Sequence, residues 1–502
     1  MKWSHTTAKW STVNCFCGAN GGTRTPDRQI TNLKHYQLCY VGDALAKQQS
    51  FINETDDLIY LGYNIKGQFK EHDSLRLAMS DDTANAFLND FAQTKQGNDT
   101  IFACWARYQA AVADGHDAVN GTIGALLEND GNLAINQTVD AFVRNSPPIE
   151  IAAYAPLKGL PEFLDLAVTL ALGDARSELE NIGVHHTATA SPGGSGALYL
   201  AAANFADRGS KVLLRDRHWG PYDGFLAGCD LGIETYPLLG SNNSTVDVDS
   251  ITSSLDNLAK QQSKVMSWLN DPAHNPTGLS LNAKDRRAVL QAFSDMAMAH
   301  ENVGFTLLID AAYHLYAKEP HGWAETITDA LHDGMSWPAN LLITFAISLS
   351  KSHTIYGLRA GALVSIHPDE SVVDRITTVM GVTGRQTWSA SSRLAQYSIA
   401  RIHAEEESGD AWSLELVRLT ELLAQRRKLF IEECAKNGVP INPTHDGFFA
   451  WLEHNDPKSV VESCANDQVY LVPLKGGVRI GLCAIPTEQI AKVANSLRDA
   501  LQ

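Results

Sequence analysis

Residues 348–359, SLSKSHTIYGLR, bring a lysine, an arginine and several hydroxyl groups close together. They follow an apolar run at 341–347 that indicates a buried strand. The hydroxyls of Ser348 and Ser350 and the guanidinium of Arg359 could bind one phosphate together. Burial would lower the pKa of Lys351, as an amine that attacks an aldehyde requires. The segment predicts a phosphate site beside a Schiff-base lysine, with a solvated basic turn as the alternative.

A glycine-rich turn, SPGGSGAL at 191–198, could bind the same phosphate. In it Gly194, Ser195 and Gly196 lead directly into an Ala- and Leu-rich helical stretch. Free N–H groups at the start of a helix bind anions, and glycine allows an anion to approach the backbone. Such turns are also common as plain helix entries, so this motif alone identifies no ligand.

Two further motifs supply groups that suit an aromatic, anionic cofactor. Asp310 ends the run 305–309, and a carboxylate there could keep a pyridine nitrogen protonated, although a helix cap is the alternative. Asn275, in NDPAHNPTG, could donate to a phenolate oxygen on the same ring. Asn-Pro is also a common turn starter.

Short aliphatic runs alternate with longer amphipathic segments from about residue 97 onward. This alternation favours an α/β fold in which helices flank a mostly parallel sheet. Ligands of such sheets bind beyond the carboxyl ends of the strands, so we expect the four motifs to meet there. The predicted strands cover residues 211–214, 264–269, 305–309, 341–347 and 360–366.

Composition narrows the classes of protein that the chain can belong to. A length of 502 residues with 44% hydrophobic and 19% charged residues excludes general disorder. No apolar run approaches the roughly 18 residues of a membrane span, and a net charge of -17 opposes broad binding to nucleic acid. Eight cysteines without a CxxC pair favour a reduced, cytoplasmic setting and predict no metal site.

The beginning of the chain differs from the remainder. Residues 1–50 contain six Lys and Arg residues against two Asp, whereas the whole chain is acidic. The stretch GANGGTRTP at 18–26 is rich in residues that break helices and strands. We therefore predict a flexible or irregular extension over residues 1–96. It lacks the apolar centre of a secretory signal, and its acid-poor start leaves a transit peptide as the alternative.

Jointly and in this order, the motifs resemble the active site of the fold type I, pyridoxal-phosphate-dependent aminotransferases, of the aspartate and aromatic subgroup. The resemblance covers most of residues 99–502. It implies a mostly parallel central sheet flanked by helices, together with a smaller α+β domain. The large cofactor-binding domain would comprise residues 146–390, and the small domain residues 97–145 and 391–502.

The resemblance assigns pyridoxal 5′-phosphate as the cofactor and Lys351 as the residue that holds it in an internal aldimine. It also implies catalytic roles for Asp310, which bonds the pyridine nitrogen, and for Tyr313, which with Asn275 donates to the ring oxygen. Trp219, in RHWG, matches the residue that stacks on the ring, with a merely buried tryptophan as the alternative. The residues that match the phosphate site are Gly194, Ser195, Gly196, Ser348, Ser350, Arg359 and Tyr154, the last reaching the neighbouring subunit.

Substrate contacts follow from the same resemblance. Arg479, in GVRIG, matches the arginine that binds the substrate α-carboxylate, although one residue is missing between it and Pro486. Ile123 and Gly124 match a loop that closes over the substrate. Arg385, in GRQTWSA, matches the arginine for a distal carboxylate, with a structural salt bridge as the alternative. After the aromatic residue of this segment, here Trp388, the family usually has Ser-Asn, whereas this chain has Ser-Ala at 389–390. This departure favours keeping aromatic amino acids among the expected substrates.

The resemblance implies amino transfer from an L-amino acid, aspartate or aromatic, to a 2-oxo acid such as 2-oxoglutarate. The enzyme would be a cytoplasmic homodimer with shared active sites, binding neither nucleic acid nor membrane. A C–S β-lyase with the same cofactor is one alternative, and a non-catalytic sensor module is the other. The preferred donor and acceptor, the physiological direction and the role of residues 1–96 stay open.

Overall fold

The computed structural model describes residues 85–95, 97, 99–240 and 245–502. Most of the predicted extension, residues 1–84, lies outside these ranges. The short helix α4 (Asp90–Gln93) belongs to the first of two units, residues 1–97, and Asn89 caps it by accepting from the Ala92 N–H. Residues 98–502 form the second unit, which contains all the predicted motifs.

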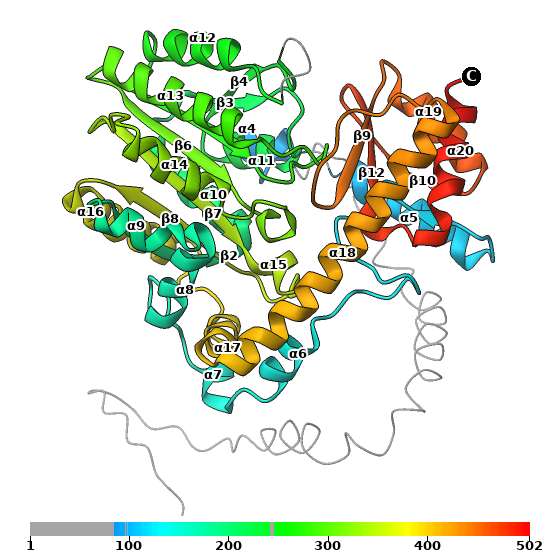
Figure 1. The fold of residues 1–502 in the computed structure, drawn as a ribbon, viewed down its shortest axis with the longest axis horizontal. Helices are drawn as coiled ribbons and strands as arrows, with labels where there is room; N and C mark the ends of the chain where they lie inside the picture. The colour runs from blue at the N-terminus through cyan, green and yellow to red at the C-terminus, as the bar shows by residue number, and fades with distance from the viewer. Residues whose placement is uncertain (1–84, 96, 98, 241–244) are drawn as a thin grey trace, which may run out of the picture. The chain divides into compact units, whose positions relative to one another are not determined.

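A seven-stranded sheet with the strand order β2-β8-β7-β6-β5-β3-β4 forms the centre of the second unit (Figure 1). Only β8 runs antiparallel to its neighbours, so the predicted α/β fold with a mostly parallel sheet is confirmed. All five predicted strands are present, and β2 and β4 were not predicted. The strands are β2 (His185–Pro192), β3 (Lys211–Arg215), β4 (Gly232–Tyr236), β5 (Lys264–Asn270), β6 (Gly304–Asp310), β7 (Leu341–Ser348) and β8 (Ala360–His367).

Helices cover both faces of this sheet, which explains why its strands are almost continuously apolar. Along β6, Phe305, Leu307 and Ile309 pack into one hydrophobic core, and Leu308 points into another on the opposite face. The first face is covered by α8 (Pro161–Leu172), α12 (Val248–Ala259), α13 (Ala283–Ala299) and α14 (Gly322–His332). The second face is covered by α10 (Gly193–Phe205), α11 (Pro221–Gly228) and α16 (Glu370–Thr387).

A second, smaller sheet lies toward the carboxyl terminus of the chain. It has the antiparallel order β11-β12-β9, and β1 pairs separately with β10 in parallel. These strands share a core of their own with three helices. The elements are β1 (Val119–Asn120), β9 (Phe449–Glu453), β10 (Val469–Tyr470), β11 (Val472–Leu474), β12 (Gly477–Gly481), α18 (Glu406–Asn437), α19 (Pro457–Asn466) and α20 (Ile490–Ala500).

The long helix α18 connects the two cores (Figure 1). Its Leu423 packs into the core of the large sheet, whereas Phe430, two turns later, packs into the core of the small sheet. The exact division into a large and a small domain stays a prediction. The remaining α-helices are α5 (Thr100–Ala113), α6 (Gln137–Arg144), α7 (Pro148–Ala152), α9 (Ala175–Asn181), α15 (Leu349–Ser352) and α17 (Arg393–Ala404).

Across the part of the chain that the structure describes, no helix combines the length and apolar character needed to cross a membrane.

Glycine is required where β8 passes the start of α10. A Cβ atom on Gly361 would lie 2.5 Å from the Gly193 carbonyl carbon and 2.5 Å from the Ile347 carbonyl oxygen. Both neighbours are backbone atoms, which cannot move aside as a flexible side chain can. This close approach holds the glycine turn beside the end of β7, where Ser348 begins the lysine motif.

We expect Gly361→Ala to destabilise the fold by about 1–3 kcal/mol or more, because overpacked backbone must shift. Thermal and denaturant unfolding of the purified variant measure this loss. Gly357→Ala is the matched control, since a Cβ there would meet nothing within 4 Å. Equal stability of the two variants would contradict the packing argument.

Candidate functional site

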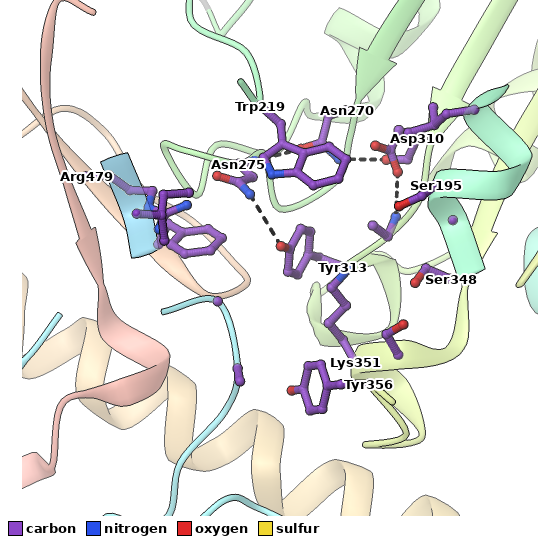
Figure 2. A pocket seen from close by; sticks show the side chains of 18 of the residues that line it. Ser195, Trp219, Asn270, Asn275, Asp310, Tyr313, Ser348, Lys351, Tyr356 and Arg479 are labelled. Carbon is purple, nitrogen blue, oxygen red and sulfur yellow. Dashed lines mark hydrogen bonds between the residues drawn. The ribbon is translucent and has the colours of Figure 1, made fainter. Parts of the chain in front are cut away.

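A cavity of about 410 Å³ opens at the carboxyl ends of β5, β6 and β7, where residues of the small sheet also reach it (Figure 2). In Figure 2, Arg479 lies at one end, Ser195 and Ser348 at the other, and Lys351 with Tyr313 between them. Most of the predicted site residues line it: Gly124, Gly194, Ser195, Trp219, Asn275, Asp310, Tyr313, Ser348, Ser350, Lys351, Arg359 and Arg479.

One end of the cavity is suited to a phosphate group. Arg359 Nη1 donates to Ser350 Oγ at 3.1 Å, so the guanidinium and the hydroxyl lie together. A Cβ on Gly193 would come within 2.6 Å of Arg359 Nη2, and one on Gly194 within 3.0 Å of Ser348 Cβ. Only glycines leave this cradle open. Hydroxyls, a guanidinium and a helix start are the groups that bind a phosphate, so the residues fit one.

Asp310 ends β6 and is buried, with 4% of its surface exposed. Its Oδ1 accepts from the Ala312 N–H at 3.1 Å, and its Oδ2 accepts from the Tyr222 hydroxyl. Burial raises the pKa of Asp310, while Tyr222 and the charge of Lys351 act in the opposite direction. The site therefore holds a desolvated carboxyl group that depends on its donors to stay charged.

Lys351 lies in the short helix α15, directly after β7, with its Nζ 4.8 Å from the centre of the Tyr313 ring. Desolvation lowers the pKa of Lys351 from 10.5 to about 8, and Arg359 contributes to the lowering while Asp310 opposes it. A substantial fraction of the amine is consequently neutral near physiological pH. A neutral amine is the form that attacks a carbonyl group.

Two polar side chains occupy the middle of the cavity wall. Asn275 Nδ2 donates to the Tyr313 hydroxyl at 3.4 Å, and the Asn275 N–H donates to Asn270 Oδ1 at 2.7 Å. Burial raises the pKa of Tyr313, so its hydroxyl stays protonated and able to donate. Trp219 contributes an aromatic surface to the same cavity. This combination suits a flat ring with an oxygen substituent.

Arg479, on β12, lies at the other end with only 2% of its surface exposed. Its Nη2 donates to the Thr122 carbonyl at 2.5 Å, and its guanidinium lies 4.5 Å from the centre of the Phe449 ring. Its Nε has no hydrogen-bond partner, and no carboxylate of the described ranges forms an ion pair with it. Such a guanidinium can bind the carboxylate of a ligand.

Four predicted site residues do not line this cavity. Gly196 lies inside α10, where a Cβ would come within 2.5 Å of Pro192 Cδ, so packing accounts for this glycine. Ile123 packs against the main core, and its carbonyl accepts from Cys483 Sγ at 3.3 Å. Tyr154 is 87% exposed. Arg385 is exposed in the last turn of α16 and donates to Ser389 Oγ at 2.5 Å.

Several residues around the cavity were not predicted from the sequence. Asn270 ends β5, and its position at a strand exit could have identified it. Tyr356 lies within the lysine motif, and its hydroxyl accepts from the Leu126 N–H at 3.1 Å. Phe449 and the helix start at Ile101 and Phe102, by contrast, carry no local signal. Within the described ranges, no group of three or more His, Cys, Asp or Glu side chains could hold a metal ion.

The pKa of Lys351 predicts a pH dependence for its reaction with an aldehyde. With pyridoxal phosphate added to cofactor-free protein and trapped by borohydride, labelling at 351 should accelerate as the pH rises through about 8, because the amine loses its proton there. Peptide mapping at several pH values measures this rate, and Lys351→Arg is the control. A rise centred near 10.5, the ordinary pKa of a lysine, would contradict the desolvation argument.

Comparison with known proteins gives a consistent result. The protein named aromatic-amino-acid aminotransferase of Escherichia coli (strain K12) is 27% identical over 319 residues, covering 62% of this chain and 76% of that protein. The mitochondrial aspartate aminotransferase of Schizosaccharomyces pombe is 24% identical over 355 residues, covering 68% and 75%.

Solved structures share the fold. An aminotransferase from Anaerococcus prevotii has a TM-score of 0.77 at 24% identity, covering 82% of this chain and 98% of that one. An aromatic-amino-acid aminotransferase from Burkholderia pseudomallei, covalently bound to pyridoxal phosphate, has a TM-score of 0.66 at 20% identity, covering 83% and 100%.

The family described as aminotransferase class I and II matches residues 117–497, and that range contains every residue of the lysine, glycine, aspartate and asparagine motifs. The chain belongs to the class I and II aminotransferase family.

Proposed function

We propose that this chain transfers an amino group reversibly from an L-amino acid, aspartate or aromatic, to a 2-oxo acid such as 2-oxoglutarate, with pyridoxal phosphate as its cofactor. The observation that carries this proposal is the placement of Lys351 in one cavity with the carboxylate of Asp310 and with the guanidinium of Arg479, which forms no ion pair within the described ranges. Relatives named for aromatic and aspartate substrates support it, as does a structural relative with bound pyridoxal phosphate.

The cavity residues divide into those that would hold the cofactor and those that would act on the substrate. Lys351 would bind the cofactor covalently, and Asp310 would hold a proton on its ring nitrogen. When bound, pyridoxal phosphate supplies a protonated ring that accepts electron density from the substrate α-carbon. The other cofactor contacts are proposed for Gly194, Ser195, Ser348, Ser350, Arg359, Trp219, Asn275 and Tyr313.

Arg479 would bind the α-carboxylate of the amino acid in the bidentate manner of a guanidinium. This contact would orient the α-hydrogen toward the amine of Lys351, which could take up that proton once the amino group of the substrate had displaced it from the cofactor. The lowered pKa of Lys351 suits a proton carrier that works near neutral pH. The Phe449 ring, 4.5 Å from the guanidinium, covers one face of this group with an apolar surface.

We also propose that the enzyme is a homodimer. Tyr154 and Arg385 do not line the cavity of their own chain. The segments that carry them are neighbours, since Lys158, four residues after Tyr154, contacts Gly381, four residues before Arg385: a Cβ on Gly381 would be 3.2 Å from Lys158 Cγ. Exposed apolar side chains lie near them along the chain: Ile149, Ile151, Leu157 and Val382. Apolar clusters of this kind often mark protein interfaces, and a twofold axis would bring both residues to the partner's cavity.

A cytoplasmic location is part of the same proposal. The five cysteines in the described part of the chain, Cys104, Cys229, Cys434, Cys464 and Cys483, are all free, which agrees with a reducing setting.

The substrate assignment predicts a selective effect of Arg385→Ala. Conversion of the bound cofactor to its amine form should slow by roughly 10- to 100-fold with aspartate and glutamate, because a charged hydrogen-bond partner is lost. It should hardly change with phenylalanine, which has no distal carboxylate. Stopped-flow absorbance of each half-reaction measures this, and Arg375→Ala, an exposed arginine on the same helix, is the control.

Equal slowing with all amino acids would refute the role of Arg385. Pyruvate formed from L-cystathionine without any oxo acid would favour the β-lyase alternative over amino transfer. Full turnover by Lys351→Ala would refute the proposed function as a whole.

The dimer proposal predicts complementation between two defective chains. Lys351→Ala and Arg385→Ala chains, unfolded and refolded together, should regain about a quarter of the wild-type aspartate activity, because only mixed dimers contain one intact shared site. Each variant refolded alone is the control. No gain on mixing, with mixed dimers demonstrated by mass spectrometry, would show that Arg385 serves its own chain.

A further inference from the structure

Tyr222, in the first turn of α11, is a buried residue behind the cavity lining that none of the recognised motifs contains. Only 1% of its surface is exposed, and its hydroxyl donates to Asp310 Oδ2. Its ring meets the edges of Trp268 and Trp219 at centroid distances of 5.0 and 5.6 Å, and stacks against His218 at 6.1 Å. Three aromatic neighbours thus restrict the direction in which the hydroxyl can point.

The carboxylate of Asp310 depends on few donors. Its two oxygens receive one protein hydrogen bond each, from the Ala312 N–H and from Tyr222. Burial favours the neutral form of Asp310, and both hydrogen bonds favour the charged form. Burial, and to a smaller extent the charge of Asp310, raises the pKa of Tyr222 well above the ordinary value of 10. The hydroxyl of Tyr222 therefore keeps its proton and can donate it in a hydrogen bond.

We propose that Tyr222 is a positioning residue that keeps the Asp310 carboxylate charged and turned toward the ring nitrogen of the cofactor. This inference rests on the role proposed above for Asp310. Without the hydroxyl, Oδ2 loses its donor in a desolvated site, and the carboxyl group takes up a proton more readily. A neutral carboxyl group no longer stabilises a protonated ring nitrogen, so the cofactor binds less tightly.

The test compares two ligands of cofactor-free protein. One is pyridoxal phosphate, and the other is its analogue with a C–H group in place of the ring nitrogen, which makes no bond to Asp310. In Tyr222→Phe, the Kd for pyridoxal phosphate should rise about 10-fold, as expected when a hydrogen bond to a charged group is lost. The Kd for the analogue should stay unchanged. Equilibrium titration followed by absorbance gives both constants.

Tyr236→Phe is the matched control. Tyr236 is equally buried, with 1% of its surface exposed, but its hydroxyl interacts with Arg215 and not with Asp310. This variant should bind both ligands with unchanged preference. Melting temperatures of the two cofactor-free variants and the wild type show whether each chain remains folded.

Each outcome decides the matter. A selective loss for pyridoxal phosphate in Tyr222→Phe supports the inference. An equal loss for both ligands would overturn it, because Tyr222 would then serve only to pack against Trp219 and Trp268. An unchanged Kd for both ligands would overturn it too. If Asp310→Asn had the same preference between the two ligands as the wild-type protein, the proposed role of Asp310 itself would be wrong. That failure is distinguishable, because it appears without any change at Tyr222.

Discussion

Burial of charge at one edge of the large sheet is the constraint on which the site depends. Desolvation raises the pKa of Asp310 and lowers the pKa of both Lys351 and Arg479, so each group is pushed toward its neutral form. The protein offsets this only in part, with two donors for the carboxylate and one backbone carbonyl for the guanidinium. A ligand of complementary charge therefore meets groups already in place.

The architecture explains how so many polar groups reach one cavity. Parallel strands deliver their carboxyl ends to the same edge, so Asn270, Asp310 and Ser348 end adjacent strands. The second sheet adds Arg479 from β12 and Phe449 from the neighbouring strand β9. Helix α18 contributes apolar side chains to both cores and so joins the two sheets.

Two exposed residues that the family resemblance assigned to the active site, Tyr154 and Arg385, lie outside the cavity of a single chain. The cavity of a single chain therefore contains Lys351 with the groups proposed for the phosphate and the α-carboxylate, whereas those proposed for the distal carboxylate and the second phosphate contact do not line it. The proposed site shared between two chains would account for both features.

The sequence by itself indicated five strands of the large sheet, the residue types at their ends and thereby the chemistry available. Apolar runs that stop at Asp310 or Ser348 are local signals, because a strand buried on both faces needs a continuous apolar stretch. Only the tertiary structure decided which distant side chains complete the site. Tyr222 bonds Asp310 across 88 positions, and Arg479 faces Phe449 through the pairing of two strands. No local sequence pattern predicts such contacts, because they form only when elements that are far apart in the sequence pack together.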